Sequence, residues 1–245
     1  MMEDREYAVM YGVEDTHWWY KGMQSITCAL LDRVCGSRKG SLRILDAGCG
    51  TGGVIEYLRD YGQVTACDYS EQALRFCRTR RHERLARASV MALPYADARF
   101  DLVTSFDVLC THGVSDDEVA LREFARVLKP DGLLLLRLPA YDWLRGRHDV
   151  KVEIRHRYSA RELKDKLRRS ALEPAHISYA NMLLFPIALL KRLSERVLPP
   201  QAGSDLTLNT GALNGVLRAL LGLEAPLVAR TRLPFGLTLV ALGRK

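Results

Sequence analysis

The segment that most constrains this chain runs from Leu45 to Gly53 and reads Leu-Asp-Ala-Gly-Cys-Gly-Thr-Gly-Gly. It follows a strand-like apolar stretch, and its closely spaced glycines let the backbone approach a ligand. A helix that begins directly after the glycines would turn its free N–H groups toward that ligand. The segment therefore predicts a nucleotide-type site at the carboxyl end of a parallel strand.

The rest of the chain alternates strand-like and helix-like segments, the pattern of a doubly wound α/β domain. Helix starts are indicated at Ser70 and by two capping boxes, 115–118 and 159–162. The predicted strands are 42–46, 64–68, 85–89, 100–106, 133–138, 176–180 and 235–242. The segment 133–138 is apolar except for Arg137, as expected for a strand covered on both faces.

Two pieces lie outside this alternation. The first, residues 1–41, holds the aromatic cluster 17–20 and a helix predicted to run from there to Cys35. We predict that 1–41 is an N-terminal lid segment and that 42–245 is the main domain. The second piece, 181–233, is predicted to be a largely helical insertion between the last two strands.

The insertion contains an amphipathic stretch, Pro186–Leu198, with apolar residues on one helical face and charges opposite. Such a helix can close over an apolar substrate, form a homodimer face, or lie on a membrane surface. The sequence leaves these three interpretations open.

Composition narrows the protein class. Six cysteines with no C-x-x-C pair predict neither a disulfide framework nor a zinc site, so we expect no metal and a reducing compartment. No apolar run is long enough to span a membrane, and the acidic segment 1–6 lacks the apolar stretch of a secretory signal. These features predict a cytoplasmic protein. The net charge of +7 permits an acidic partner such as nucleic acid, phosphate or anionic lipid.

Two cofactors fit the glycine-rich loop. The spacing Gly48-x-Gly50-x-x-Gly53 satisfies the dinucleotide fingerprint, and Asp68 stands 20 residues beyond Gly48, where a ribose-binding acid is expected. Asp46, however, places a carboxylate just before the glycines, where it would repel a pyrophosphate. The same carboxylate would attract a cation that carries an ammonium and a sulfonium. The charge therefore favours S-adenosylmethionine (SAM) over NAD.

At these residues the sequence resembles the class I SAM-dependent methyltransferases of the bacterial small-molecule type. Four ordered segments carry the resemblance: Leu45–Gly53, Val64–Ser70, Met91–Tyr95 with Phe100–Val103, and Leu121–Gly132. The resemblance covers about residues 40–180. It implies a Rossmann-like α/β fold with a doubly wound sheet of seven strands, the last of them antiparallel.

The resemblance also implies a set of cofactor-binding residues. Asp46 and Gly48 would lie near the methionine end of SAM, and Asp68 would accept hydrogen bonds from the ribose. Ser89 stands where the family usually has Asp, and its hydroxyl can still accept a bond from the adenine amine. The full set is Tyr11, Tyr20, Lys21, Asp46, Gly48, Cys49, Gly50, Asp68, Tyr69, Ser89, Val90 and Phe106.

Three of these residues, Tyr11, Tyr20 and Lys21, belong to the N-terminal piece. There, residues 14–20 resemble a segment that forms a lid over the cofactor in bacterial members of the family. The alternative is a helix that only packs on the core.

Methyl transfer is an in-line displacement, which depends mainly on alignment, and a general base helps when the acceptor is a weak acid. We therefore expect a base in the loops after the fourth and fifth strands. His112 and His148 are the candidate catalytic residues, and His156 is a weaker one.

The loop after the fifth strand also carries arginines that can hold a phosphate or carboxylate: Arg145, Arg147, Arg155 and Arg157. We therefore expect an anionic or glycosylated, partly apolar acceptor, with O-methylation favoured and S-adenosylhomocysteine as the second product. A nucleic-acid methyltransferase, suggested by charge alone, and a non-catalytic SAM-binding partner protein remain as alternatives.

Overall fold

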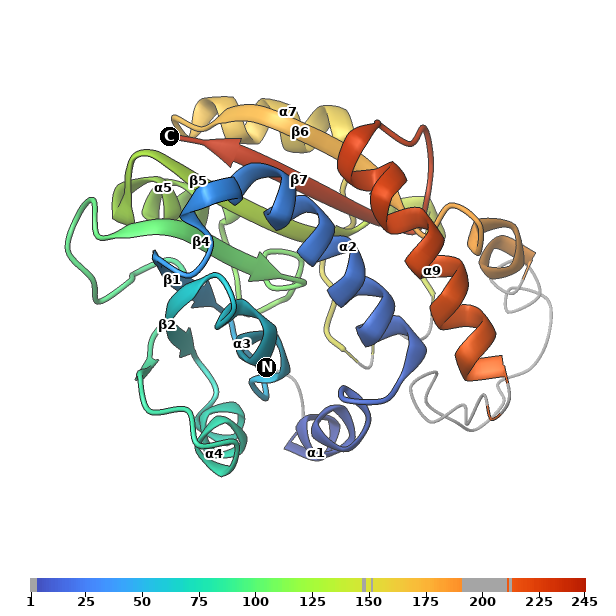
Figure 1. Ribbon diagram of the computed structural model, residues 1–245, viewed down its shortest axis with the longest axis horizontal. Helices are drawn as coiled ribbons and strands as arrows, with labels where there is room; N and C mark the ends of the chain where they lie inside the picture. The colour runs from blue at the N-terminus through green and yellow to red at the C-terminus, as the bar shows by residue number, and fades with distance from the viewer. Residues whose placement is uncertain (1–3, 147–148, 151, 191–210, 212) are drawn as a thin grey trace.

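A twisted sheet of seven strands forms the centre of the molecule (Figure 1). The computed structural model describes residues 4–146, 149–150, 152–190, 211 and 213–245. The strand order is β3-β2-β1-β4-β5-β7-β6, and β7 is antiparallel to both of its neighbours. The predicted fold class, a doubly wound sheet whose last strand is antiparallel, is therefore confirmed.

The observed strands lie close to the predicted ranges. They are β1 (Leu42–Ala47), β2 (Gly62–Asp68), β3 (Leu85–Arg87), β4 (Phe100–Phe106), β5 (Leu128–Pro139), β6 (Glu173–Ala180) and β7 (Thr238–Arg244). The largest difference is in β5, which begins five residues earlier than the predicted 133 because Phe100 pairs with Leu128 before a register shift.

Helices cover both faces of the sheet (Figure 1). The helices are α1 (Asp4–Val13), α2 (Trp18–Cys35), α3 (Gly53–Leu58), α4 (Glu71–Thr79), α5 (Asp117–Val127), α7 (Ala160–Arg169) and α9 (Leu213–Arg230). Short 3-10 turns occur at Gly36–Arg38 and Asp142–Leu144. One apolar core joins α2, α3 and α9 to the sheet, and a second joins α5 and α7 to the opposite face.

Side-chain caps define the helix starts. Ser70 accepts a hydrogen bond from the Ala73 N–H, and Ser159 accepts one from Glu162, both as predicted. The capping box at 115–118 was placed one residue early, because Asp116, not Ser115, accepts the N–H groups of the first turn. An aspartate at this position also favours the positive end of the helix dipole.

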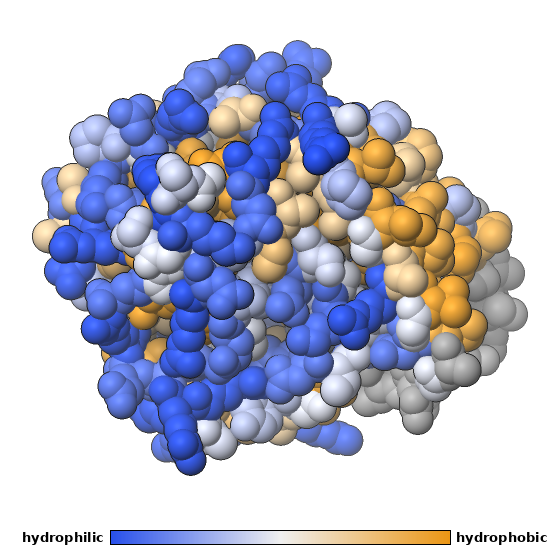
Figure 2. Space-filling model, in the orientation of Figure 1, coloured by the Kyte–Doolittle hydropathy of each residue, from blue (hydrophilic) through white to orange (hydrophobic). Residues whose placement is uncertain are grey.

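The predicted insertion contributes one long helix and an apolar surface. Helix α9 packs along α2, and residues 185–190 form a separate helical segment nearby. Figure 2 shows apolar side chains gathered over these two helices, among them Ile187, Leu190 and Leu223, each about two-thirds exposed. Most of the predicted helix Pro186–Leu198 lies outside the described residues.

The described helices were also compared with the length and apolarity that a membrane span requires. None of the helices within the described ranges meets both requirements.

Candidate active site

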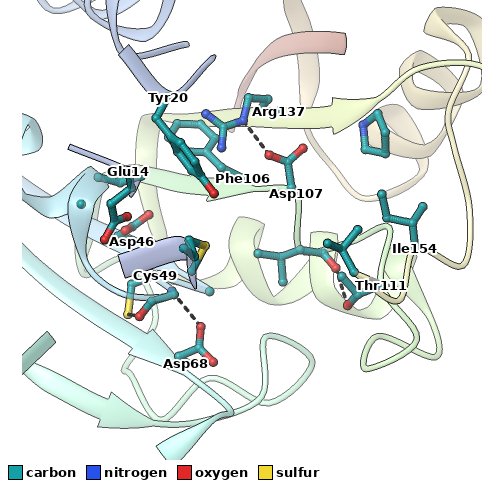
Figure 3. Close-up of a pocket in the computed structure, with 18 of the residues that line it drawn as sticks. Glu14, Tyr20, Asp46, Cys49, Asp68, Phe106, Asp107, Thr111, Arg137 and Ile154 are labelled. Atoms are coloured by element: carbon teal, nitrogen blue, oxygen red, sulfur yellow. Dashed lines mark hydrogen bonds and ion pairs between the residues drawn. The ribbon is translucent and has the colours of Figure 1, made fainter. Parts of the chain in front are cut away.

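A cavity of about 870 Å³ opens at the carboxyl ends of β1, β2 and β4. Its floor is the turn between β1 and α3, and α1 and α2 supply the wall above that turn (Figure 3). The edge of a parallel sheet where neighbouring strands diverge is the usual ligand position in doubly wound folds. The predicted site and the observed cavity therefore coincide.

The glycine-rich turn contains backbone conformations that residues with a side chain rarely adopt. Gly48, Gly50 and Gly52 all have positive φ, at 84°, 53° and 90°. A Cβ on Gly48 would overlap the side chain of Val108, so the turn admits no side chain there. The Gly48 and Cys49 N–H groups donate to the Cys67 carbonyl, which holds the turn against β2.

Asp68 fixes the other side of the turn. Its Oδ2 accepts the Gly50 N–H at 2.9 Å, and its Oδ1 accepts the Ser70 N–H at 2.8 Å. Burial raises the pKa of Asp68, while these N–H donors act in the opposite direction. Each oxygen keeps a second lone pair, so the carboxylate can still accept hydrogen bonds from a diol.

Asp46 is a buried carboxylate with one unsatisfied oxygen. Thr104 donates to its Oδ1 at 2.8 Å, whereas Oδ2 is buried and has no hydrogen-bond partner. Burial raises the pKa of Asp46 to about 7, and the Asp68 charge adds to the rise. A buried acceptor without a donor is costly, so a ligand that brings a cationic donor would be favoured.

Helix α1 is fastened over the turn by Glu14. Its Oε1 accepts the Thr51 hydroxyl at 2.5 Å and the Arg80 guanidinium at 2.9 Å. Met10 lies so close that a Cβ on Gly50 would crowd its methyl group. The N-terminal piece therefore covers the turn, in the position expected of a lid.

The three predicted lid residues have different positions. Tyr20 and Lys21 line the cavity, with the Lys21 Nζ bonded to Gln24. Tyr11 does not line it: its ring stacks on Phe76 of α4 at 4.7 Å. Its expected cofactor contact is therefore not supported, because α1 turns that ring toward α4.

Tyr20 extends from α2 toward the middle of the cavity, where Figure 3 draws its hydroxyl between Asp46 and Asp107. Burial, followed by the Glu14 charge, raises the pKa of Tyr20. Its hydroxyl therefore stays protonated and acts as a hydrogen-bond donor.

Arg137 interrupts the apolar run 133–138 of β5 at the cavity wall. Its Nε donates to Asp107 Oδ2 at 2.7 Å, and its guanidinium lies 4.8 Å from the ring centres of both Trp19 and Phe106. Burial alone would lower the pKa of Arg137, but Asp107, together with Tyr57 and Tyr20, more than offsets this and the net shift is upward. Asp107 itself has φ of 58°, a strained value for a residue with a side chain.

The predicted adenine-side residues line the cavity together. Tyr69, Ser89 and Val90 all contribute, and Tyr69 is 60% exposed. Phe106, at the end of β4, lines the cavity as well. The Ser89 hydroxyl already accepts the Met91 N–H at 3.2 Å. It can therefore donate to an adenine nitrogen more readily than it can accept a further bond.

Cys49 belongs to the lining through its backbone. Its Sγ lies 3.8 Å from the Cys77 Sγ of α4, away from the turn's open side. Burial and the Cys77 thiol raise the pKa of Cys49 well above its usual value. The side chain is a packing group between the loop and α4.

The expected histidine base is not found among the described lining residues of the β4 and β5 loops. His112 is exposed and does not line the cavity, although its neighbours Thr111 and Gly113 do. His148 lies outside the described residues. His156 is held between Asp142 and Glu162, with 2.8 Å to each carboxylate.

Arg145 and Arg157 of the loop after β5 hydrogen-bond within the protein, whereas the buried Nε of Arg155 has no partner among the described residues. Arg157 donates to both oxygens of the buried Asp149, at 2.7 and 3.1 Å, and to a backbone carbonyl. Arg145 bonds to Asp142 and to the Arg155 carbonyl. Arg147 lies outside the described residues. All three nitrogens of Arg157 are thus hydrogen-bonded within the protein, and the binding of an acceptor anion by the loop arginines stays a prediction.

The sequence analysis missed Glu14 and Arg137 as site residues. Glu14 had no local signature, since its partners lie 37 and 66 residues away. Arg137 did carry a signal, because a lone arginine in a strand buried on both faces requires a specific partner. His17 was also overlooked: it lines the cavity, and its buried Nε2 has no partner.

The comparison with protein families gives a direct match. Residues 45–136 match a family described as "Methyltransferase domain". Over these residues the predicted resemblance to methyltransferases is confirmed. The matched region contains the glycine-rich turn, Asp68 and the strands β1 to β5 up to Leu136.

Curated relatives match the methyltransferase domain over part of their length. Malonyl-[acyl-carrier protein] O-methyltransferase of Enterobacter lignolyticus is 40% identical over 104 residues, 42% of this chain and 41% of the relative. The ubiquinone/menaquinone biosynthesis C-methyltransferase UbiE of Shewanella oneidensis is 31% identical over 141 residues, 53% of each. The chain thus spans about half the length of these relatives.

Solved structures share the fold over nearly the whole chain. A chain of the complex between the Haloferax volcanii Trm112 methyltransferase activator and a methyltransferase aligns with a TM-score of 0.65 at 18% identity, covering 100% of this chain and 98% of that one. A sarcosine dimethylglycine methyltransferase structure from Galdieria sulphuraria gives 0.63 at 16%, with 99% and 97% covered. At these identities the likeness concerns the fold alone.

Proposed function

We propose that this methyltransferase-family chain transfers a methyl group from SAM to a small, partly apolar acceptor, with O-methylation favoured. The observation that carries the proposal is the unsatisfied Asp46 Oδ2, buried at the rim of a turn that only glycine can form. That oxygen fits an ammonium group, and it disfavours the pyrophosphate of NAD. The names of the relatives, one an O-methyltransferase and one a C-methyltransferase, support the reaction class and leave the acceptor atom open.

The chain's own residues then have distinct tasks. Asp46 would bind the ammonium end of SAM, and Asp68 would accept the ribose hydroxyls while holding the turn in place. Tyr69, Ser89 and Val90 would border the adenine. When bound, SAM would supply a methyl group on a sulfonium: the acceptor oxygen would bond to the methyl carbon, the S–C electron pair would remain on sulfur as S-adenosylhomocysteine, and a hydroxyl acceptor would release its proton to water.

The apolar half of the cavity supports a partly apolar acceptor. Its lining includes Val114, Pro139, Leu144 and Ile154, with Ala188 contributed by the helical segment 185–190. One residue of the predicted insertion therefore reaches the site, which supports its interpretation as a substrate lid. Homodimer formation and membrane contact through 186–198 remain predictions.

The decisive experiment is calorimetric titration of the purified protein with SAM, S-adenosylhomocysteine and NAD in parallel. Binding of the first two alone is the expected result. Binding of NAD alone would overturn the charge argument at Asp46. A screen for acceptors by a 14-dalton mass gain then separates an enzyme from a non-catalytic SAM-binding protein, and inclusion of RNA and DNA tests the nucleic-acid alternative.

A further inference from the structure

Arg137 is the one arginine of the described cavity wall whose hydrogen-bonding capacity is largely unused. Only its Nε has a partner, Asp107, and neither terminal nitrogen bonds to the described protein. Arg157, the other arginine that lines the cavity, donates hydrogen bonds to Asp149 and to the Ala140 carbonyl. A guanidinium offers five N–H donors, so Arg137 keeps four available.

The orientation of Arg137 is fixed in advance. Trp19 and Phe106 hold its guanidinium between their rings at 4.8 Å each, and Asp107 fixes the Nε edge. The Asp107 N–H in turn donates to the Arg137 carbonyl at 2.8 Å, so the pair is joined through backbone and side chain. An arginine held in this way loses little side-chain freedom when it binds an anion.

The surroundings favour an anion of a single charge. Glu14, Asp46 and Asp107 line the same cavity, and the Tyr20 hydroxyl between them is a donor. A dianionic phosphate would be repelled by these carboxylates, whereas one planar carboxylate matches the guanidinium fork. We propose that Arg137 binds a carboxylate group of the methyl acceptor, which makes it the residue that selects acidic over neutral acceptors.

This inference rests on the proposed function, and it assigns to Arg137 the role first expected of the loop arginines. It also specifies the position of the acid: next to Phe106 at the end of β4. The rest of the acceptor would then lie along the Pro139–Ile154 side of the wall.

The test uses probes that need no knowledge of the acceptor. Octanoate, octanamide and octyl phosphate are titrated by calorimetry into the full-length protein saturated with S-adenosylhomocysteine. We expect octanoate to bind about 10–100-fold more tightly than octanamide, the range for a charge-assisted hydrogen-bonded pair, and more tightly than octyl phosphate. Equal affinities, no octanoate binding, or a preference for octyl phosphate would overturn the proposal.

Variants then assign the preference to Arg137. Arg137→Gln should abolish the preference for octanoate, and Arg137→Lys should keep part of it. Arg145→Gln is the matched control, since it removes an equal charge from an exposed arginine of the same loop region and should change nothing. The double variant Arg137→Gln/Asp107→Asn avoids an unpaired carboxylate, so a loss of preference there cannot be attributed to misfolding caused by Asp107.

The affinity for S-adenosylhomocysteine distinguishes the possible failures. A wild-type protein that does not bind it would contradict the proposed function itself. If the wild type binds but Arg137→Gln weakens that binding as much as it weakens octanoate binding, Arg137 serves the cofactor's carboxylate and the inference is wrong. Unchanged cofactor affinity with lost octanoate preference is the supporting result.

Discussion

Two buried arginines stand in the wall of the same cavity and are held in different ways. Arg157 gives two hydrogen bonds to Asp149 and one to the Ala140 carbonyl, and its carboxylate partner is 1% exposed. Arg137 gives a single bond to Asp107, whose side chain is 32% exposed. The difference shows that residue type and burial alone do not identify a binding residue. What identifies it is the hydrogen-bonding capacity that the protein leaves unused.

The largest expected effect tests this comparison through stability. Arg157→Gln leaves Asp149 buried without its ion partner and should reduce the free energy of unfolding by about 3–5 kcal/mol. Arg137→Gln should cost less than about half of that, because water can reach Asp107. Urea denaturation followed by circular dichroism measures both. If the two variants lose equal stability, the Arg157–Asp149 and Arg137–Asp107 pairs contribute equally to folding, and the proposed difference between them is wrong.

The distinction between structural and ligand-binding contacts also applies to Asp68, a carboxylate of the cofactor half. Asp68→Ala removes both the anchor of the glycine-rich turn and the ribose acceptor, so the affinity for S-adenosylhomocysteine should fall about 100-fold. Asp68→Asn keeps one acceptor oxygen and should lose about 10-fold. Calorimetry measures both, and a folded Asp68→Ala protein with full affinity would remove Asp68 from the site.

The pH dependence tests the spare oxygen of Asp46. With a pKa of about 7 in the folded protein, this carboxyl is mostly protonated at pH 6 and mostly ionised at pH 8. SAM affinity should therefore rise about 10-fold over that range, with proton release on binding, and Asp46→Asn should flatten the profile. Because the folded pKa exceeds that of the unfolded chain, Asp46 also makes the free protein less stable as pH rises from about 4 to 7.

Titrations in two buffers of different ionisation enthalpy count the released protons. A pH-independent affinity with no proton exchange would show that the ammonium group does not meet Asp46.

The smallest effect is expected at His112. Its side chain is exposed, so His112→Ala should change stability by less than about 0.5 kcal/mol and cofactor affinity by less than about twofold. Once the acceptor screen provides a substrate, turnover should be equally unaffected. A large loss of turnover at unchanged cofactor affinity would restore His112 as a catalytic base.

The cofactor half of the site could be predicted from the sequence because its parts are local. Asp46 to Gly53 are contiguous, and Asp68 follows one helix and one strand later, so strand order alone brings them together. The wall around Arg137 could not be predicted in this way. Trp19, Phe106 and Arg137 come from distant segments and meet only through the pairing of β4 with β5 and the packing of α2.

Local geometry explains the errors. Thr111 pairs with Ile154 in a short bridge, and residues 112–113 then form a turn closed by the Val114 N–H, which donates to the Thr111 carbonyl. Thr111 and Gly113 therefore line the cavity while His112 points away, a one-residue distinction that the sequence does not contain.

Glu14 has a consequence for how the site can be observed. It bonds to Thr51 of the turn and to Arg80 after α4, so the position of α1 and the order of the turn share one carboxylate. Ligand binding at the turn and docking of α1 are therefore linked, and the linkage is reciprocal. A ligand that orders the turn stabilises docked α1 by the same free energy that docked α1 adds to ligand binding. Slower amide hydrogen exchange along Asp4–Val13 therefore reports ligand binding at the site, and this measurement requires no turnover.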